Sequence, residues 1–326
     1  MECGAWKREF KNFIDMKKVL LIIAATLATA VAVSAQDMAQ ATETYNNGAM
    51  ALQAGDNAGA LENFKSALTM AQACGEEGAE MVGNCKEYIP KIMFAIAKDS
   101  IKEGNYDKGL AEIDAAVAQA KEYGANDVVE DAEALVPQVL MNKANDLLKA
   151  KDLDGAIATY NRLLELNPAN GTAQLRLGMA YAQKGDAANA EAAYLGAAAN
   201  GQEKAAYKQL STMYLKDAQK ALKAQKYADA YDAAMKSNGY VESGNALYFA
   251  GMAAQKLGQE ANAVAAFEKF LIVAPNDKKA NDIKCTLAVS YQKAGNKAKA
   301  IEYYQSILSD PKYTETAKAQ IAALQK

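Results

Sequence analysis

The chain has 326 residues, of which 51% are hydrophobic, and its formal net charge is −3 at pH 7. This composition excludes a disordered or collagen-like polymer and supplies enough apolar residues for a sizeable core. The sequence contains no His, which removes the commonest general base, the commonest metal ligand and every catalytic system of the Ser–His or Cys–His type.

The first 35 residues predict an export signal. Two lysines follow Met16, an apolar run covers residues 19–33, and a small-residue cleavage motif ends at Ala35. This is the order of a secretory signal peptide, and the run is short for a bilayer span, which needs about 20 residues. We expect residues 1–35 to be a cleaved bacterial signal peptide, with 1–15 as an N-terminal extension. The alternative is a short membrane anchor that is never cut.

If the signal is cleaved, the mature chain covers 36–326 as one repeat domain that is periplasmic or secreted. It retains no stable membrane span. Its two Arg, Arg162 and Arg176, and its acidic balance also argue against a nucleic-acid partner.

A repeated pattern runs along the mature chain. Seven turn dipeptides separate helical stretches: Gly55-Asp56, Gly104-Asn105, Lys151-Asp152, Gly185-Asp186, Gln225-Lys226, Gly258-Gln259 and Gly295-Asn296. Seven positions before each turn stands a small residue: Gly48, Ala97, Ala144, Gly178, Ala218, Gly251 or Ala288. Five positions after each turn stands another: Ala60, Gly109, Ala156, Ala190, Ala230, Ala263 or Ala300. Nine positions after each turn the residues are Phe64, Ile113, Tyr160, Tyr194, Ala234, Phe267 and Tyr304.

Helix packing explains this pattern. Two antiparallel helices approach closely where both side chains are small, so the small residues before and after each turn should meet. The aromatic residue one helical turn further on then fills the wider space beyond them. Gly at the turn supplies left-handed backbone, and Asp or Asn caps the following helix. Pro168 and Pro275 mark where second helices stop.

The pattern resembles the tetratricopeptide repeat, a helix–turn–helix unit. The best stretches are residues 142–168, 175–198 and 246–275, whereas the unit around Gln225 lacks both the turn Gly and the aromatic residue. The resemblance implies an all-α, right-handed superhelical solenoid with a C-terminal capping helix over 314–325. Its seven units lie near 38–74, 75–121, 122–168, 169–201, 202–240, 241–275 and 276–311.

Two inserts lengthen the N-terminal half. Residues 75–89 and 124–136 each carry an apolar stripe at helical spacing and lead into Pro90 or Pro137. We expect them to extend the first helices of the second and third units, with a kink or break at the proline.

Cysteine pairing is left open by the sequence. Cys74 and Cys85 flank a predicted loop and could form a disulfide in an oxidising compartment. The alternative is two separate buried cysteines, and Cys285 would be unpaired in either case.

Nothing in the sequence indicates catalysis, a cofactor or a metal. Carboxylates are scattered over helices rather than paired, and no Gly-rich phosphate loop follows a strand. We therefore expect a protein that is not an enzyme; a cluster of carboxylates in a pocket would revive the enzyme hypothesis.

The resemblance implies a function for the concave face, which first helices line and which contacts extended peptides or partner helices. The residues expected there are Asn142, Asn145, Thr172, Arg176, Met179, Lys216, Gln219, Asn245, Tyr248 and Met252. We expect a protein- or peptide-binding scaffold or adaptor of the bacterial cell envelope, with self-association left open. The alternative is a carbohydrate- or peptidoglycan-binding protein, because the chain contains 17 Tyr that could stack on sugars.

Lysines recur at the ends of first helices: Lys102, Lys149, Lys223, Lys256 and Lys293. They could form a basic stripe for an acidic partner. The interpretation we favour from sequence is that they complement the negative ends of the helix dipoles.

Overall fold

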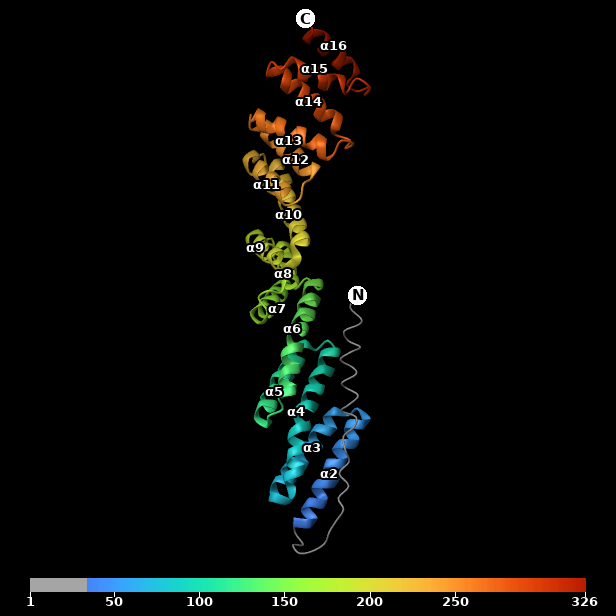
Figure 1. The fold of residues 1–326 in the computed structure, drawn as a ribbon, viewed down its shortest axis with the longest axis vertical. Helices are drawn as coiled ribbons and strands as arrows, with labels where there is room; N and C mark the ends of the chain where they lie inside the picture. The colour runs from blue at the N-terminus through green and yellow to red at the C-terminus, as the bar shows by residue number, and fades with distance from the viewer. Residues whose placement is uncertain (1–33) are drawn as a thin grey trace. The chain divides into compact units, whose positions relative to one another are not determined.

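The computed structural model describes residues 34–326, and this part of the chain is helical without any β-strand (Figure 1). The all-α fold class is thus confirmed. The predicted signal peptide lies outside the described residues except for Ser34 and Ala35, so its cleavage stays a prediction. Within the described range, no helix is both long enough and apolar enough to cross a membrane.

The helices form two compact units that divide between Asp146 and Leu147. In the first unit the structure describes α2 (Ser34–Ala54), α3 (Asn57–Ala73), the short 3-10 helix η2 (Gly75–Gly78), α4 (Ala79–Lys102), α5 (Tyr106–Tyr123) and most of α6 (Asn126–Lys149). The second unit contains α7 (Leu153–Leu166), α8 (Gly171–Lys184), α9 (Ala187–Ala197), η3 (Ala198–Gln202), α10 (Glu203–Lys223), α11 (Tyr227–Tyr240), α12 (Gly244–Lys256), α13 (Glu260–Val273), α14 (Ala280–Lys293), α15 (Lys297–Gln305) and α16 (Thr314–Leu324).

Consecutive helices pack as antiparallel hairpins in the order that the repeat pattern predicts. The packed pairs are α2–α3, α4–α5, α8–α9, α10–α11, α12–α13 and α14–α15 (Figure 1). A further pair, α6 and α7, is consecutive across the division between the units. Each of the predicted turn dipeptides therefore joins two consecutive helices.

All seven predicted turns contain a residue with left-handed backbone. Five of these residues are Gly: Gly55, Gly104, Gly185, Gly258 and Gly295. The other two are Lys151 (φ 62°) and Gln225 (φ 58°), where a side chain must tolerate a conformation that glycine adopts freely. The turn geometry thus recurs along the chain even where the glycine does not.

The same hydrogen bonds close each turn. At the fourth turn, the Gly185 N–H donates to the Ala182 carbonyl (3.2 Å) and the Asp186 N–H donates to the Tyr181 carbonyl (3.0 Å). These bonds satisfy carbonyls at the end of the first helix. The Asp186 carboxylate then accepts from the Asn189 N–H and caps α9, and Asp56, Asp152 and Asn296 cap their helices in the same way.

The small residues of the pattern pack closely, but their main contact differs from the expected one. A Cβ on Gly178 would lie 2.6 Å from the ring of Tyr194, and a Cβ on Gly48 would lie 3.1 Å from the ring of Phe64. The small residue before each of these turns therefore faces the aromatic residue of the returning helix directly, rather than only the small residue after the turn. The reason is that the flat ring itself fills the gap between the two backbones.

The predicted helix extensions, helix ends and capping helix are also present. The helices α4 and α6 are lengthened at their N-termini and continue through Pro90 and Pro137, so neither proline breaks its helix. The helices α7 and α13 end two residues before Pro168 and Pro275. The capping helix is α16, whose Ala317 is buried against α15 residues such as Tyr304.

In the second unit the helices form two layers. Two pairs of successive first helices touch, since α8 contacts α10 and α10 contacts α12. The second helices α9, α11 and α13 each pack against the first helix of their own hairpin and that of the next one, whereas no comparable contact joins successive second helices there. From α8 to α12 the first helices are thus the more closely spaced layer, as the inner face of a curved stack requires.

Candidate binding surface

Eight of the ten predicted binding residues lie in the second unit, on the first helices α8, α10 and α12. They are Thr172, Arg176, Met179, Lys216, Gln219, Asn245, Tyr248 and Met252. The remaining two, Asn142 and Asn145, lie on the part of α6 that belongs to the first unit and are half-buried. We therefore treat the eight residues of the second unit as the candidate surface and call it the first-helix face.

Five side chains of the first-helix face are exposed: Thr172, Arg176, Lys216, Gln219 and Asn245. Thr172 accepts one long hydrogen bond from Gln202 (3.5 Å). The side chains of Gln219 and Asn245 form no hydrogen bond with any other described residue. Because these polar groups do not hold the repeats together, they are available to a ligand.

The three other side chains of the face are half-buried anchors. The Tyr248 ring packs 6.2 Å from the Phe270 ring, and the Lys279 Nζ lies 5.1 Å from the Tyr248 ring centroid. Met252 packs against the core of α12 and α13, and Met179 packs against the cluster around Tyr194. Each combines an apolar contact that fixes its position with a surface that remains open.

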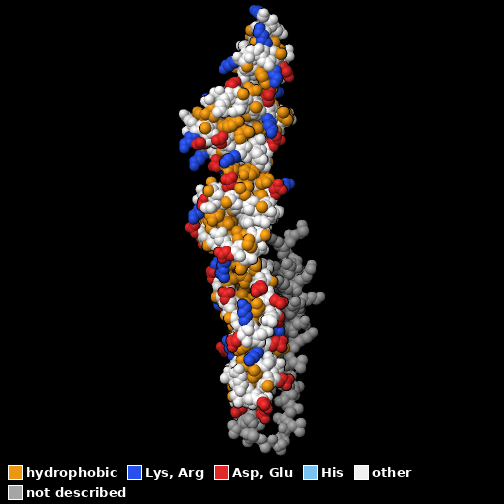
Figure 2. All heavy atoms as spheres, turned by 60° about the vertical axis from the view of Figure 1, so that its left-hand side comes forward, with side chains coloured by type: hydrophobic (Ala, Val, Ile, Leu, Met, Phe, Trp, Pro, Cys, Tyr) orange, Lys and Arg blue, Asp and Glu red, His pale blue; other side chains and the backbone are white. Residues whose placement is uncertain are grey.

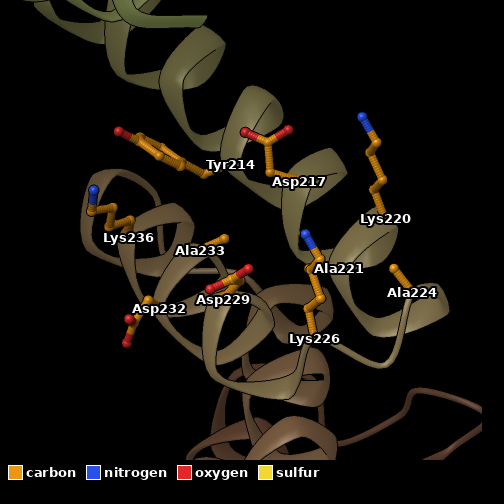
Figure 3. Close-up of a pocket in the computed structure, with 10 residues that line it drawn as sticks. All are labelled: Tyr214, Asp217, Lys220, Ala221, Ala224, Lys226, Asp229, Asp232, Ala233 and Lys236. Carbon is orange, nitrogen blue, oxygen red and sulfur yellow. The ribbon is translucent and has the colours of Figure 1, made fainter.

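A hollow of about 410 Å³ lies elsewhere in the unit, between α10 and α11. Figure 3 shows Tyr214, Asp217 and Lys220 entering from α10, and Asp229 and Asp232 from α11. Acidic and basic side chains alternate around it, so the hollow favours neither sign of charge. Burial, together with the Glu191 carboxylate, raises the pKa of Tyr214 well above its usual range, which keeps this phenol neutral.

A polar cluster that the sequence did not reveal joins α13, α14 and α15. The Tyr291 and Tyr303 hydroxyls donate to Glu268 Oε1 (2.6 and 3.2 Å), and Lys299 Nζ donates to the same oxygen (3.2 Å). The two tyrosine rings stack with centroids 5.9 Å apart. Periodicity alone could not reveal the cluster, because its members come from three helices.

The Cys74–Cys85 disulfide, which the sequence left open, is not formed in the structure, where Cys74, Cys85 and Cys285 are free thiols. Cys74 follows the end of α3, and Cys85 lies in the core of the first unit with Ile89 and Phe64. Burial raises the pKa of Cys85 to about 12. Such a thiol is unreactive and its packing is that of a small hydrophobic residue.

Metal-binding groups and clusters of charge are the other features that could form a site among the described residues. Within residues 34–326, no group of Cys, Asp and Glu is placed to hold a metal ion. On the side that Figure 2 presents, charges of both signs are scattered over the surface, with hydrophobic side chains between them. The first-helix face is therefore the candidate that the geometry supports best.

Three segments match models of the tetratricopeptide repeat: residues 141–205, 244–277 and 286–312. The last two cover most of the hairpins α12–α13 and α14–α15. These segments are tetratricopeptide repeats, which confirms the resemblance for this part of the chain. No curated protein matches the sequence.

Several solved structures are similar to this chain at low sequence identity. The MamA protein is 19% identical over 56% of this chain and 96% of its own, with a TM-score of 0.35. YrrB, described as a TPR protein with an unusual peptide-binding site, is 22% identical over 60% and 97%, with a TM-score of 0.33. TTC0263, a thermophilic TPR protein in Thermus thermophilus, is 17% identical over 58% and 98%, with a TM-score of 0.26. Such low scores support no conclusion about binding.

Proposed function

We propose that this chain, with its tetratricopeptide repeats, is a non-catalytic scaffold or adaptor that binds a protein or peptide through the first-helix face. The observation that carries the proposal is how buried and exposed residues are distributed around α8, α10 and α12. One side of each helix holds the buried small and apolar residues, and the other presents exposed polar side chains, among them Gln219 and Asn245.

The chemistry of the face suits a polypeptide ligand. The exposed amides of Gln219 and Asn245 offer both donors and acceptors, which can pair with the backbone of an extended segment. Tyr248 and Met252 on the same face offer apolar contact to its side chains. Polar groups set around half-buried anchors are the usual anatomy of a protein-binding surface.

We also propose that the protein is exported by the signal peptide in residues 1–35 and acts in the cell envelope. The support is the order of charged, apolar and small residues there. Cell fractionation with sequencing of the mature N-terminus tests this part separately. A mature chain that still contains residues 1–35, found in the cytoplasm, would reject it.

The binding proposal is tested by quantitative affinity capture with two matched double variants. The face variant is Gln219→Ala with Asn245→Ala, and the control variant, on second helices, is Asn161→Ala with Gln305→Ala. All four side chains are exposed, so both variants should fold and melt like the wild type. We expect the face variant to capture a specific partner less well and the control to retain it. Equal capture by both variants would reject the first-helix face.

A further inference from the structure

Charge is segregated between the two layers of the second unit. Basic residues outnumber acidic ones on each of the first helices α8, α10, α12 and α14. Acidic residues outnumber basic ones on the second helices α7, α9, α11 and α13, and only the last second helix, α15, departs from this rule. The chain as a whole has a net charge of −3, so the excess of positive charge on the first helices is local.

Five of these cations lie in one register. Arg176 and Lys216 stand two residues before the small residue of their helix, and three lysines stand five residues after it. At about 100° per residue, both positions lie about 140–160° around the helix from the small residue. That residue faces the second helix, so the cations point away from it. We call this set the basic stripe: Arg176, Lys216, Lys223, Lys256 and Lys293.

The basic stripe is exposed and carries no ion pair. All five side chains are exposed, and none forms a salt bridge with another described residue. Some other cations of the unit are paired, as Lys184 is with Asp154 (2.5 Å) and Lys312 is with Asp282 (2.6 Å). Others, such as Lys204 and Lys278, form no salt bridge with a described residue either, so what sets the stripe apart is its shared register on successive first helices. Of the acidic residues on these helices, Asp282 is paired with Lys312, and Asp217 lines the hollow between α10 and α11.

Helix-dipole complementarity explains only part of the stripe. A cation in the last turn is favourable, and this accounts for Lys223, Lys256 and Lys293. Arg176, however, lies in the middle of α8, and Lys216 lies almost two turns before the end of α10. The dipole acts mainly on the terminal turn, so these two cations require another explanation.

We propose that the basic stripe binds an extended acidic segment of a partner protein, whose Asp or Glu side chains pair with cations on successive first helices. The inference deepens the proposed function and rests on it. The uncharged amides beside the stripe suit a polypeptide backbone, and the acidic second helices disfavour a long polyanion such as nucleic acid.

Fluorescence anisotropy tests the proposal with two probes, a labelled peptide of alternating Glu and Ser and its counterpart of alternating Gln and Ser. The stripe variant replaces Arg176, Lys216, Lys223, Lys256 and Lys293 by Gln. The control variant replaces one Arg and four Lys that are exposed and lie off the stripe: Arg162, Lys204, Lys208, Lys278 and Lys297. Both variants change the net charge equally, and circular dichroism melting verifies that both fold.

We expect the wild type to bind the Glu peptide and not the Gln peptide. The stripe variant should lose at least about tenfold in affinity, since each exposed ion pair contributes modestly, and the control should change less than about twofold. Equal losses in both variants would overturn the proposal, because the binding would then reflect overall charge. Tighter binding of a single-stranded DNA oligonucleotide, abolished in the stripe variant, would also overturn it in favour of a polyanion site.

Light scattering of the wild type alone tests whether a second copy of this chain binds the basic stripe. A dimer at low salt that the stripe variant cannot form would overturn the proposal in favour of self-association. The proposed function has its own readout in the affinity capture. If the partner depends on Gln219 and Asn245 but the stripe variant still captures it fully, the present inference fails and the proposed function stands.

Discussion

Gly251 of α12 lies directly against the ring of Phe267 on α13: a Cβ on Gly251 would be 2.4 Å from Phe267 Cε1. Phe267 is buried, so its ring has little room to withdraw. The two residues lie on either side of the turn at Gly258, and they set how closely the hairpin closes. The same relationship joins Gly178 to Tyr194 two repeats earlier.

Gly251→Ala is therefore expected to destabilise the second unit, although alanine ordinarily favours a helix. We expect a loss of about 1–3 kcal/mol in urea denaturation, the usual cost of overpacking a core. Gly239→Ala on α11 is the matched control, because nothing lies within 4 Å of its Cβ position. It should gain up to about 1 kcal/mol from helix propensity.

A double variant separates crowding from other effects of the Gly251 substitution. Adding Phe267→Leu to Gly251→Ala should cost less than the sum of the two single changes, because the smaller side chain frees the space that Cβ needs. Strictly additive losses would show that the two residues do not interact.

Glycine substitutions in two of the turns should stabilise the protein. Gln225→Gly is expected to stabilise the protein by about 1 kcal/mol, since Gln225 has a φ of 58° and a left-handed residue with a Cβ costs about 1–2 kcal/mol. Lys151→Gly, at a φ of 62°, should act in the same direction. Ala224→Gly, one residue before Gln225 at a φ of −82°, should instead destabilise the protein. A result in which Gln225→Gly and Ala224→Gly both lose stability would contradict the left-handed turn at Gln225.

The hairpin architecture was predictable because its determinants are local. Gly185-Asp186 ends one helix and caps the next within a few residues, and Gly178 and Tyr194 are brought together by the turn between them. Local spacing cannot show which groups converge from separate repeats. Glu268, Tyr291 and Lys299 meet only once three helices have packed, so this cluster was invisible in the sequence.

The exposure of candidate binding residues was predictable in the same limited sense. The repeat register placed Gln219 and Asn245 on an exposed helix face, as the structure has them. It could not separate paired from unpaired lysines: Lys102 contacts Asp99 (3.0 Å), whereas Lys256 forms no salt bridge with a described residue. Ion pairing depends on rotamers and on neighbouring helices, and neither is encoded in spacing. The division at Asp146 likewise has no signal in the repeat pattern.

The three thiols of the described residues should differ in reactivity. Cys85 is buried and its pKa is raised to about 12, so in the native protein it should resist iodoacetamide at pH 8. Cys74 and Cys285 are only half-buried and should react first. Peptide mass spectrometry measures the three sites separately. A disulfide-linked Cys74–Cys85 peptide under non-reducing conditions would contradict the free thiols.

The Glu268 cluster should make stability depend on pH. Burial raises the pKa of Glu268, but hydrogen bonds from Tyr291, Lys299 and Tyr303 outweigh it and hold the pKa below its ordinary value of 4.5. Because the folded-state pKa is the lower one, the stabilisation is present above the unfolded pKa and is lost as pH falls through the folded value.

Glu268→Gln should therefore cost about 1.5–3 kcal/mol at pH 7, the size expected for hydrogen bonds to a charged group. Its difference from the wild type should shrink as the pH falls from 5 to 3. Glu260→Gln, an exposed position on the same helix, is the control and should show little change. A Glu268→Gln difference that stays constant over this range would contradict the role of the ionised carboxylate.

The central claim is that a protein partner occupies the first-helix face of the second unit. Site-specific photo-crosslinking in the native cell tests it most directly, with benzoylphenylalanine placed at Asn245 on α12 or at Asn161 on α7. Both side chains are exposed, and only Asn245 belongs to the face. We expect a discrete protein adduct from position 245 and none from position 161. Adducts from position 161 alone, or the same adducts from both, would contradict it.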